Sequence, residues 1–215
     1  MRGADFRLLS LCERTVTTRS LENGTLLRVS TGKLEGMTTE LDVLKRVSEG
    51  LSAESLPFML TGSFALAYYA TPRMTRDLDF VVALAADDAE ALLRTFSSDF
   101  YIDADAVRAA LENERLFNMM HLSSGIKVDL IVRKSSEYRL TEFARRQQVT
   151  LGAVLTWIVS REDLILSKLV WSLDSGSELQ LRDVRQLLVG PIDVDYLNRW
   201  APELDVETPL RKLML

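Results

Sequence analysis

Cysteine and histidine are almost absent from this sequence. Among 215 residues, Cys12 is the only cysteine and His121 is the only histidine. A single cysteine excludes an internal disulfide and any cysteine-based zinc cluster. A histidine-rich metal site or a Ser-His-Asp triad would need His121, which lies in the strand-like stretch FNMMHLSS with no evident nucleophile nearby. We therefore expect a structural imidazole there.

Long apolar runs and an excess of positive charge are also missing. No apolar run approaches the roughly 20 residues that cross a bilayer, and no secretory-signal pattern follows the first residues, so we expect a cytoplasmic protein without a membrane partner. The formal charge of −5 argues against a general nucleic-acid coat and leaves room only for a local basic groove. The best candidate for such a groove is RKSSEYRLTEFARRQQ, residues 133–148, although a solvated face explains the same pattern.

The order of patterns along the chain predicts three parts. Residues 1–36 form an extension of uncertain structure, with a possible hairpin turn at Asn23-Gly24. Residues 37–158 interleave helical and strand patterns, which predicts an α/β or α+β core with a mixed sheet. Its expected elements are a helix over 39–51, strands FMLTG, LDFVVAL, FNMMHL and IKVDLIV, a short helix from 63, and helices over 88–96 and 103–116. Residues 159–215 look all-helical, with an N-cap at Ser160 and a helix end at Gly190-Pro191.

Three aspartates stand in or beside two apolar strands. Side chains alternate along a strand, so Asp77 and Asp79 point to one face while the apolar residues between and after them pack on the other. Asp129 interrupts the apolar strand IKVDLIV, where a lone carboxylate is costly without a partner. If the two strands are neighbours, three carboxylates meet, and Mg²⁺ is the usual way to relieve their repulsion. An exposed strand end remains the alternative for an isolated D-x-D.

Gly62 and Ser63 stand where a strand is expected to turn into a helix. A glycine allows close backbone approach, and free N–H groups at a helix start bind phosphate. A plain turn with an N-cap explains the pair equally well by itself. Together with the three aspartates, it predicts a phosphate-binding site.

The stretch LTGSFALAYYATPRMTRDLDFVV followed by KVDLIV resembles the nucleotidyltransferase superfamily of the DNA polymerase β type. The likeness covers residues 58–132 at the level of motifs and is strongest to small bacterial minimal nucleotidyltransferases and abortive-infection toxins. It implies a mixed-sheet nucleotidyltransferase core with a C-terminal helical segment. It further implies that Gly62 and Ser63 contact the triphosphate, that Asp77 and Asp79 bind metal, and that Asp129 binds metal and assists the attacking group.

Three basic residues are further candidates for phosphate binding. Lys168 lies on or beside the apolar stripe of the helix from Ser160, where it either snorkels or reaches the β- or γ-phosphate, and Asp183 in the next helix can pair with it. Arg73 and Arg76 precede the D-x-D and are equally consistent with phosphate clamps and with surface charges.

The first hypothesis is an Mg²⁺-dependent enzyme, with two ions, that moves a nucleoside monophosphate from an NTP to an acceptor hydroxyl and releases pyrophosphate. The acceptor can be a tRNA or other RNA, a protein or a small molecule, and a toxin of this kind would have a cognate antitoxin. The alternative is a catalytically silent nucleotide- or partner-binding module on the same fold, against which the complete set of three carboxylates argues.

Overall fold

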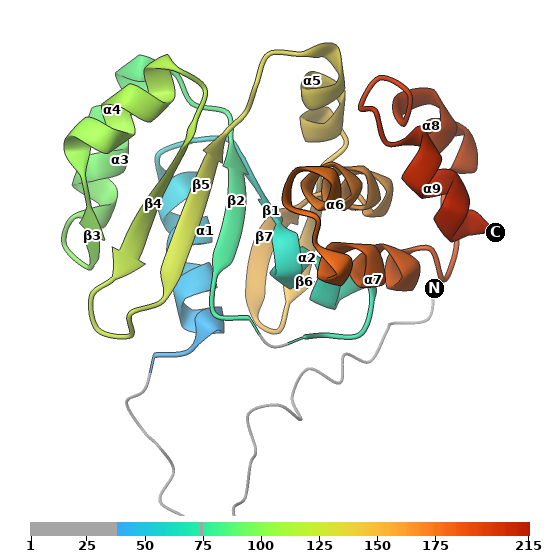
Figure 1. Cartoon of the computed structure of the whole chain (residues 1–215). Helices are drawn as coiled ribbons and strands as arrows, with labels where there is room; N and C mark the ends of the chain where they lie inside the picture. Colours follow the sequence, from blue (N-terminus) through green and yellow to red (C-terminus); the bar gives the residue numbers. More distant parts are fainter. Residues whose placement is uncertain (1–37, 74) are drawn as a thin grey trace, which may run out of the picture.

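The computed structural model describes residues 38–73 and 75–215, and this part of the chain forms a mixed sheet with helices packed on both faces (Figure 1). The strands are β1 (Phe58–Thr61), β2 (Leu78–Val82), β3 (Phe100–Ile102), β4 (Leu116–His121), β5 (Lys127–Val132), β6 (Gln147–Leu151) and β7 (Val154–Ile158). The helices are α1 (Glu40–Ala53), α2 (Gly62–Tyr69), the 3₁₀ turn η2 (Ala86–Asp88), α3 (Ala89–Phe96), α4 (Ala104–Glu112), α5 (Glu137–Ala144), α6 (Arg161–Ser175), α7 (Glu178–Leu187), α8 (Val194–Trp200) and α9 (Glu207–Met214). The predicted α/β class with a mixed sheet is confirmed. The extension over residues 1–36, including Cys12 and the expected turn at Asn23-Gly24, lies outside the described residues.

The strands follow the order β3-β4-β5-β2-β1-β7-β6. The central pair β2 and β5 is parallel, and β1 lies antiparallel on the other side of β2. Antiparallel strands β4 and β3 extend the sheet beyond β5, while β7 pairs in parallel with β1 and carries β6 at the other edge. The two strands that hold the D-x-D motif and Asp129 are therefore neighbours at the centre of the sheet.

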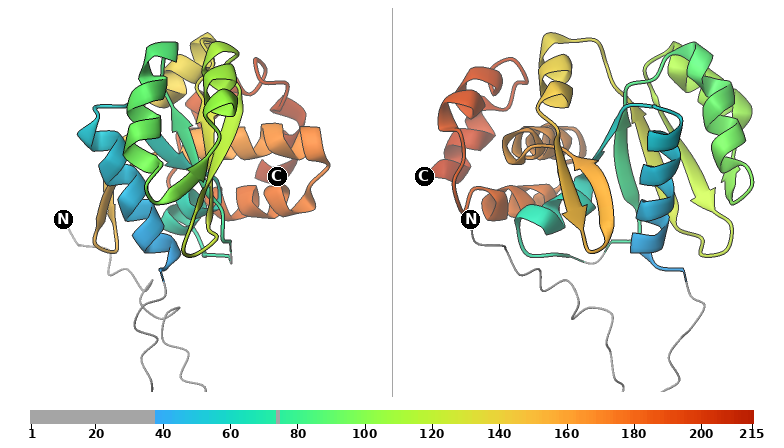
Figure 2. Two further views of the ribbon diagram at one scale, coloured as in Figure 1. Left: turned by 90° about the vertical axis from the view of Figure 1, so that its left-hand side faces the viewer. Right: turned by 180° about the vertical axis from the view of Figure 1, so that it is seen from behind.

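Alternating burial shows that the two faces of the sheet differ. In β5 the side chains of Val128, Leu130 and Val132 are buried, while those between them are only partly buried. Helix α1 crosses the buried face, as the rear view shows (Figure 2), and α3 and α4 lie on the same side. Helices α2, α6 and α7 lie on the other side toward β1 and leave the surface of β5, β4 and β3 uncovered (Figure 1).

We call the part of this surface on β5 and β4, together with the adjoining Asp79 of β2, the open face. Its members are the partly buried or exposed side chains of three adjacent strands, in register with one another: Asp79 of β2, Lys127, Asp129 and Ile131 of β5, and Leu116, Asn118 and Met120 of β4. Both strand carboxylates thus belong to the side of the sheet that helices leave accessible.

Several elements differ from the sequence prediction. Helix α4 ends at Glu112 rather than at Leu116, because Glu114 adopts a positive φ of 49° and the chain turns directly into β4. The β6–β7 hairpin, which turns at Gly152 with φ 60°, the short strand β3 and helix α5 were not predicted. Helix α7 ends at Leu187, before the expected stop at Gly190.

Two local predictions are matched in the structure. Ser160 caps α6, since its side chain accepts a hydrogen bond from the backbone N–H of Asp163. His121 Nδ1 lies 2.9 Å from Ser124 Oγ and its ring packs edge-on against Phe100, as expected of a structural imidazole. Among the helices described, none has the length and apolar character needed to span a membrane.

Candidate functional site

The register of the central strands places two of the three predicted carboxylates side by side. Asp79 in β2 pairs directly with Asp129 in β5, so both side chains point to the open face. Asp77 precedes β2 and is exposed. Within residues 38–73 and 75–215, no group of three or more carboxylate, imidazole or thiolate side chains is arranged to hold a metal ion. The structure therefore brings together a pair, and leaves Asp77 at its margin.

Gly62 lies against the Asp79 carboxylate. It has a φ of 65°, which favours glycine, and a Cβ at this position would lie 1.9 Å from Asp79 Oδ2. The contact follows from the sheet, because Thr61 at the end of β1 pairs with Asp79. Glycine is thus required twice, by the backbone conformation and by the approach of the carboxylate.

The first turn of α2 begins at the same point. Its N-cap residue, Thr61, makes no side-chain hydrogen bond to the helix, so the leading N–H groups have no side-chain cap. Ser63 is buried in this turn, and its hydroxyl has no hydrogen-bond partner among the described residues. Uncapped N–H groups, a free hydroxyl and the positive end of a helix together form a suitable seat for a phosphate group.

Burial disfavours the ionised form of the Asp79 carboxylate. Desolvation raises its pKa to about 6, and the negative charges of Asp129 and Asp77 act in the same direction. The ammonium groups of Lys168 and Lys127 oppose this shift. No described residue donates a hydrogen bond to either oxygen of Asp79, so a cation supplied from outside would relieve a real electrostatic cost.

Asp129 has a partner for one oxygen only. Lys127 Nζ donates a hydrogen bond to Oδ2 at 2.8 Å. The same ammonium lies 2.8 Å from Oδ1, but in a geometry that makes no hydrogen bond, and Oδ1 is buried without a partner in the described part of the chain. Lys127 sits on the open face two residues before Asp129, where alternation brings both side chains to the same side. Sequence reasoning missed this lysine, although the K-x-D spacing in an evident strand was a usable signal.

Lys168 is buried in the interface between α6 and α7 rather than snorkelling to the surface. Its Nζ donates hydrogen bonds to Asp183 Oδ2 at 2.7 Å and to Gln180 Oε1 at 3.1 Å. The predicted pairing with Asp183 is thus present, while Gln180 was not anticipated. Desolvation lowers the Lys168 pKa, against the effect of Asp183. Its positive charge also acts on Asp79, which places the ammonium within electrostatic reach of the carboxylate pair.

The two candidate arginines occupy different surroundings. Arg73 is half-buried, and its Nε lies 3.3 Å from the same Asp183 oxygen that Lys168 contacts. Arg76 is exposed and lies 3.9 Å from Glu40 of α1, which is at the limit of an ion pair. Arg73 therefore joins the Lys168 group, whereas Arg76 stands apart from it.

The residues present are suited to Mg²⁺. This ion is usually bound through one or two carboxylates, with waters and substrate phosphates completing its shell. The adjacent Asp79 and Asp129 provide that number, and Oδ1 of Asp129 is a buried acceptor that takes no hydrogen bond from the described residues. In the metal-free protein the Lys127 ammonium supplies part of the missing positive charge.

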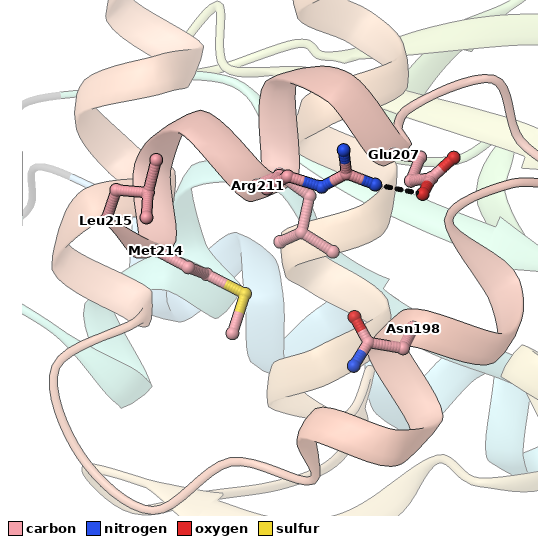
Figure 3. A pocket seen from close by; sticks show the side chains of 6 residues that line it. Asn198, Glu207, Arg211, Met214 and Leu215 are labelled. Atoms are coloured by element: carbon pink, nitrogen blue, oxygen red, sulfur yellow. Dashed lines mark hydrogen bonds and ion pairs between the residues drawn. The ribbon is translucent and has the colours of Figure 1, made fainter.

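The carboxylate site lies on the open face of the sheet. One pocket that the chain does form lies between α8 and α9 (Figure 3), and its walls are Asn198, Glu207, Leu210, Arg211, Met214 and Leu215. Arg211 pairs there with Glu207, so the charge is already balanced. None of the carboxylates or glycines described above belongs to it.

Comparison with known proteins identifies the fold. No protein-family model matches the sequence, and no curated protein sequence matches it. A solved structure of an antigenic nucleotidyltransferase-like protein from Paracoccidioides brasiliensis superposes with a TM-score of 0.52 at 18% identity, over 80% of this chain and 92% of that one.

Two structures of ANT(2'')-Ia are also similar. The solution structure of this antibiotic-resistance factor has a TM-score of 0.53 at 9% identity, over 82% of this chain and 98% of that one. The crystal structure with adenylyl-2''-tobramycin has a TM-score of 0.52 at 10% identity, over 77% and 96% of the two chains. The chain therefore has the nucleotidyltransferase fold expected from its motifs.

Proposed function

We propose that this protein is a nucleotidyltransferase that moves a nucleoside monophosphate from an NTP to an acceptor hydroxyl. The observation that carries the proposal is the pairing of Asp79 with Asp129 on the open face. Beside this pair the backbone of Gly62 approaches the Asp79 carboxylate so closely that there is no room for a larger residue. In this reaction the bond from the acceptor oxygen to the α-phosphorus forms, and the bond from that phosphorus to the β-phosphate oxygen breaks. Pyrophosphate leaves, and the hydroxyl loses its proton.

Each group of the site has a role in this proposal. The first turn of α2, with Gly62 and Ser63, would bind the triphosphate through N–H groups and a hydroxyl. Lys168, held by Asp183, would direct its charge toward the β- and γ-phosphates. Arg73 belongs to the same group, and Arg76 would need to turn inward to join it. One oxygen of Asp129 would help to hold the metal, and the other would accept the proton of the acceptor hydroxyl.

We propose Mg²⁺ as the cofactor, held by Asp79 and Asp129. When bound, it would neutralise the carboxylate pair and the charge that develops on the phosphates. Asp79 and Asp129 would fix its position, since both stand on central strands of the sheet. The two-ion arrangement implied by the resemblance would require Asp77 to turn toward the pair from its exposed position before β2.

The proposal is tested with NTP labelled on the α-phosphate or on the γ-phosphate. With Mg²⁺ and a cell extract, the α label should enter an acceptor while the γ label appears in pyrophosphate. Asp129→Asn should slow both by about 10²–10³-fold. Asp105→Asn, which removes an exposed aspartate from α4, is the matched control and should leave transfer unchanged.

A silent binding module on the same fold is the competing hypothesis. It predicts NTP binding in the parent protein with no transfer of the α label, and then Asp129→Asn would change only stability. Release of orthophosphate alone would instead indicate hydrolysis. Either result would contradict the proposed transfer reaction.

The acceptor class is open within the proposed function. The fold neighbour ANT(2'')-Ia was solved with an adenylylated antibiotic, which makes a small-molecule acceptor one candidate. An RNA acceptor, as in a toxin with a cognate antitoxin, is another. Growth arrest on expression that an adjacent gene relieves would favour the toxin. Because the reaction consumes NTP, we propose a cytoplasmic location.

A further inference from the structure

Two arginines outside the carboxylate site lie against one aromatic ring. The guanidinium carbon of Arg133 is 5.3 Å from the centre of the Phe143 ring, and that of Arg146 is 4.3 Å from it. Arg146 also lies 4.9 Å from the ring centre of Trp157. The aromatic surface therefore holds two positive charges close together.

These two charges lack compensation. Neither Arg133 nor Arg146 forms an ion pair with any described residue, and the buried Nε atom of each has no hydrogen-bond partner there. Within the described residues, the one side-chain hydrogen bond of the pair runs from Arg146 Nη1 to the backbone oxygen of Phe143 at 2.7 Å. Two neighbouring arginines of the same segment, Arg139 and Arg145, are instead paired with carboxylates. The unpaired arginines thus keep several donors for an external anion.

The arginine pair lies on the same side of the sheet as the carboxylates. Arg133 follows β5, and its backbone N–H continues the ladder by donating to Val82 at 2.8 Å. Strand alternation then brings Asp129, Ile131 and Arg133 to one face. Four residues of strand separate Asp129 from Arg133, a distance of about 13 Å. The surface between them carries Ile131 and its cross-strand partner, the partly exposed Leu116.

We propose that Arg133 and Arg146 bind backbone phosphate of a single-stranded polynucleotide whose terminal hydroxyl reaches Asp129. Guanidinium groups with free donors bind phosphate in two-point geometry, and the aliphatic side chains of Ile131 and Leu116 offer apolar surface against which an unstacked base can pack. The separation suits a strand of a few nucleotides laid along the open face. This inference rests on the proposed function and names the class of its acceptor.

The test uses a fluorescein-labelled single-stranded RNA with a free 3′ hydroxyl, and measures its binding by anisotropy over a series of salt concentrations. The parent should bind with an affinity that falls steeply with salt. The double variant Arg133→Gln/Arg146→Gln should bind several-fold more weakly. Its slope of log affinity against log salt should be smaller by about 1.4, because each phosphate contact to a single strand contributes about 0.7.

Two further variants separate charge from packing. Arg94→Gln/Arg108→Gln removes the same charge from α3 and α4 on the covered side of the sheet, and should leave the slope unchanged. Arg133→Lys/Arg146→Lys keeps the charge and should retain most of the slope. If the glutamine double variant melts before binding can be measured, each single glutamine variant should show about half of the change in slope.

The inference is overturned if the parent does not bind RNA, if the glutamine and control variants bind it equally, or if polyglutamate competes as well as unlabelled RNA. The last result would indicate a protein surface rather than a polynucleotide. Binding of Mg²⁺-ATP is measured beside each titration by calorimetry and should be unchanged in the glutamine variant. Absence of binding of ATP and of the other three NTPs in the parent would contradict the proposed function, whereas the RNA titration tests the arginine pair independently.

Discussion

Two groups of acidic side chains among the described residues have opposite surroundings. Between α5 and α6, Glu142 and Asp163 are almost fully buried. Every oxygen of these two carboxylates accepts a hydrogen bond: Arg139 and Ser167 donate to Glu142, and Arg145, Ser160 and Tyr196 donate to Asp163. We call this group, residues 139, 142, 145, 160, 163, 167 and 196, the α5–α6 joint.

The carboxylates of the open face are less buried and far less satisfied. Asp79 accepts no hydrogen bond from the described residues, and Oδ1 of Asp129 accepts none either, although it lies 2.8 Å from the Lys127 ammonium and its side chain is only 13% exposed. Both aspartates stand on central strands, where movement apart would disrupt the sheet. The difference indicates that the charges of the joint hold α5 and α6 together. The carboxylates of the open face instead remain available to bind a cation from outside the chain.

The comparison is tested most strongly by Asp163→Ala in the joint. Removing this carboxylate leaves the Arg145 guanidinium and the Tyr196 hydroxyl without their acceptor, so we expect a loss of about 3–5 kcal/mol in the free energy of unfolding. Urea denaturation measures the loss. The folded fraction should transfer nucleotide at close to the parent rate. Unchanged stability with reduced transfer would show that the joint serves the reaction and would break the distinction.

Asp129→Asn should give the opposite result. We expect transfer to fall by about 10²–10³-fold, because a positioned charged group at the reacting atoms is lost. The free energy of unfolding should stay the same or rise, since the substitution removes one of two adjacent negative charges. Single-turnover transfer and urea denaturation are measured on the same preparations, with Asp105→Asn as control. Transfer at the parent rate would remove Asp129 from the reaction.

The free energy of unfolding of the metal-free protein should depend on pH through the titration of Asp79. Its folded-state pKa is raised to about 6 from its ordinary value of 3.8, so the folded protein binds more protons than the unfolded chain between these values. The contribution of Asp79 to the free energy of unfolding is fully present below about pH 4 and is lost as the pH rises through 6. We expect the free energy of unfolding to fall by about 3 kcal/mol over this range. Asp79→Asn, which resembles the protonated form, should flatten this part of the curve.

The measurement is the difference in unfolding free energy between parent and Asp79→Asn at a series of pH values, in the presence of a chelator. Taking the difference removes the contributions of other titrating groups. Saturating Mg²⁺ with NTP should restore stability to the parent above pH 6 and have less effect on the variant. A difference that does not change with pH would mean that Asp79 is already neutralised by a neighbour.

The sequence was sufficient for those parts of the site that depend on strand periodicity. Alternation predicted that Asp79 and Asp129 share a face once their strands are neighbours, and the glycine at the strand-to-helix turn followed from local chemistry. The fold class followed from the order of the patterns. These features are local, or need only one long-range pairing.

Features that depend on tertiary placement were not predictable in the same way. Gln180 contacts Lys168 only because α6 and α7 pack at a particular rotation. The exposed position of Asp77 depends on where β2 begins, and the end of α4 depends on a positive φ at Glu114. The arginine pair was flagged only as part of a basic stretch, because the sequence does not distinguish arginines that meet carboxylates from those that meet aromatic rings.

Lys127→Met should have the smallest effect of these substitutions, a modest change in metal affinity. It tests whether the open face supplies its own counter-charge, as the joint does. In the metal-free protein the Lys127 ammonium bonds to Asp129, so a divalent ion must displace it before binding the carboxylate pair. Because Lys127 is partly exposed, breaking its ion pair with Asp129 costs little free energy. The expected gain in Mn²⁺ affinity without nucleotide is therefore about two- to tenfold, or roughly 1 kcal/mol. Mn²⁺ binding is measured by electron paramagnetic resonance, which needs no enzymatic activity.

Lys45→Met, which removes a lysine paired with Glu49 on α1, is the matched control and should bind Mn²⁺ as the parent does. A weaker affinity in Lys127→Met would mean that the lysine organises the carboxylates for the ion instead of competing with it, and the open face would then resemble the joint in holding its own counter-charge.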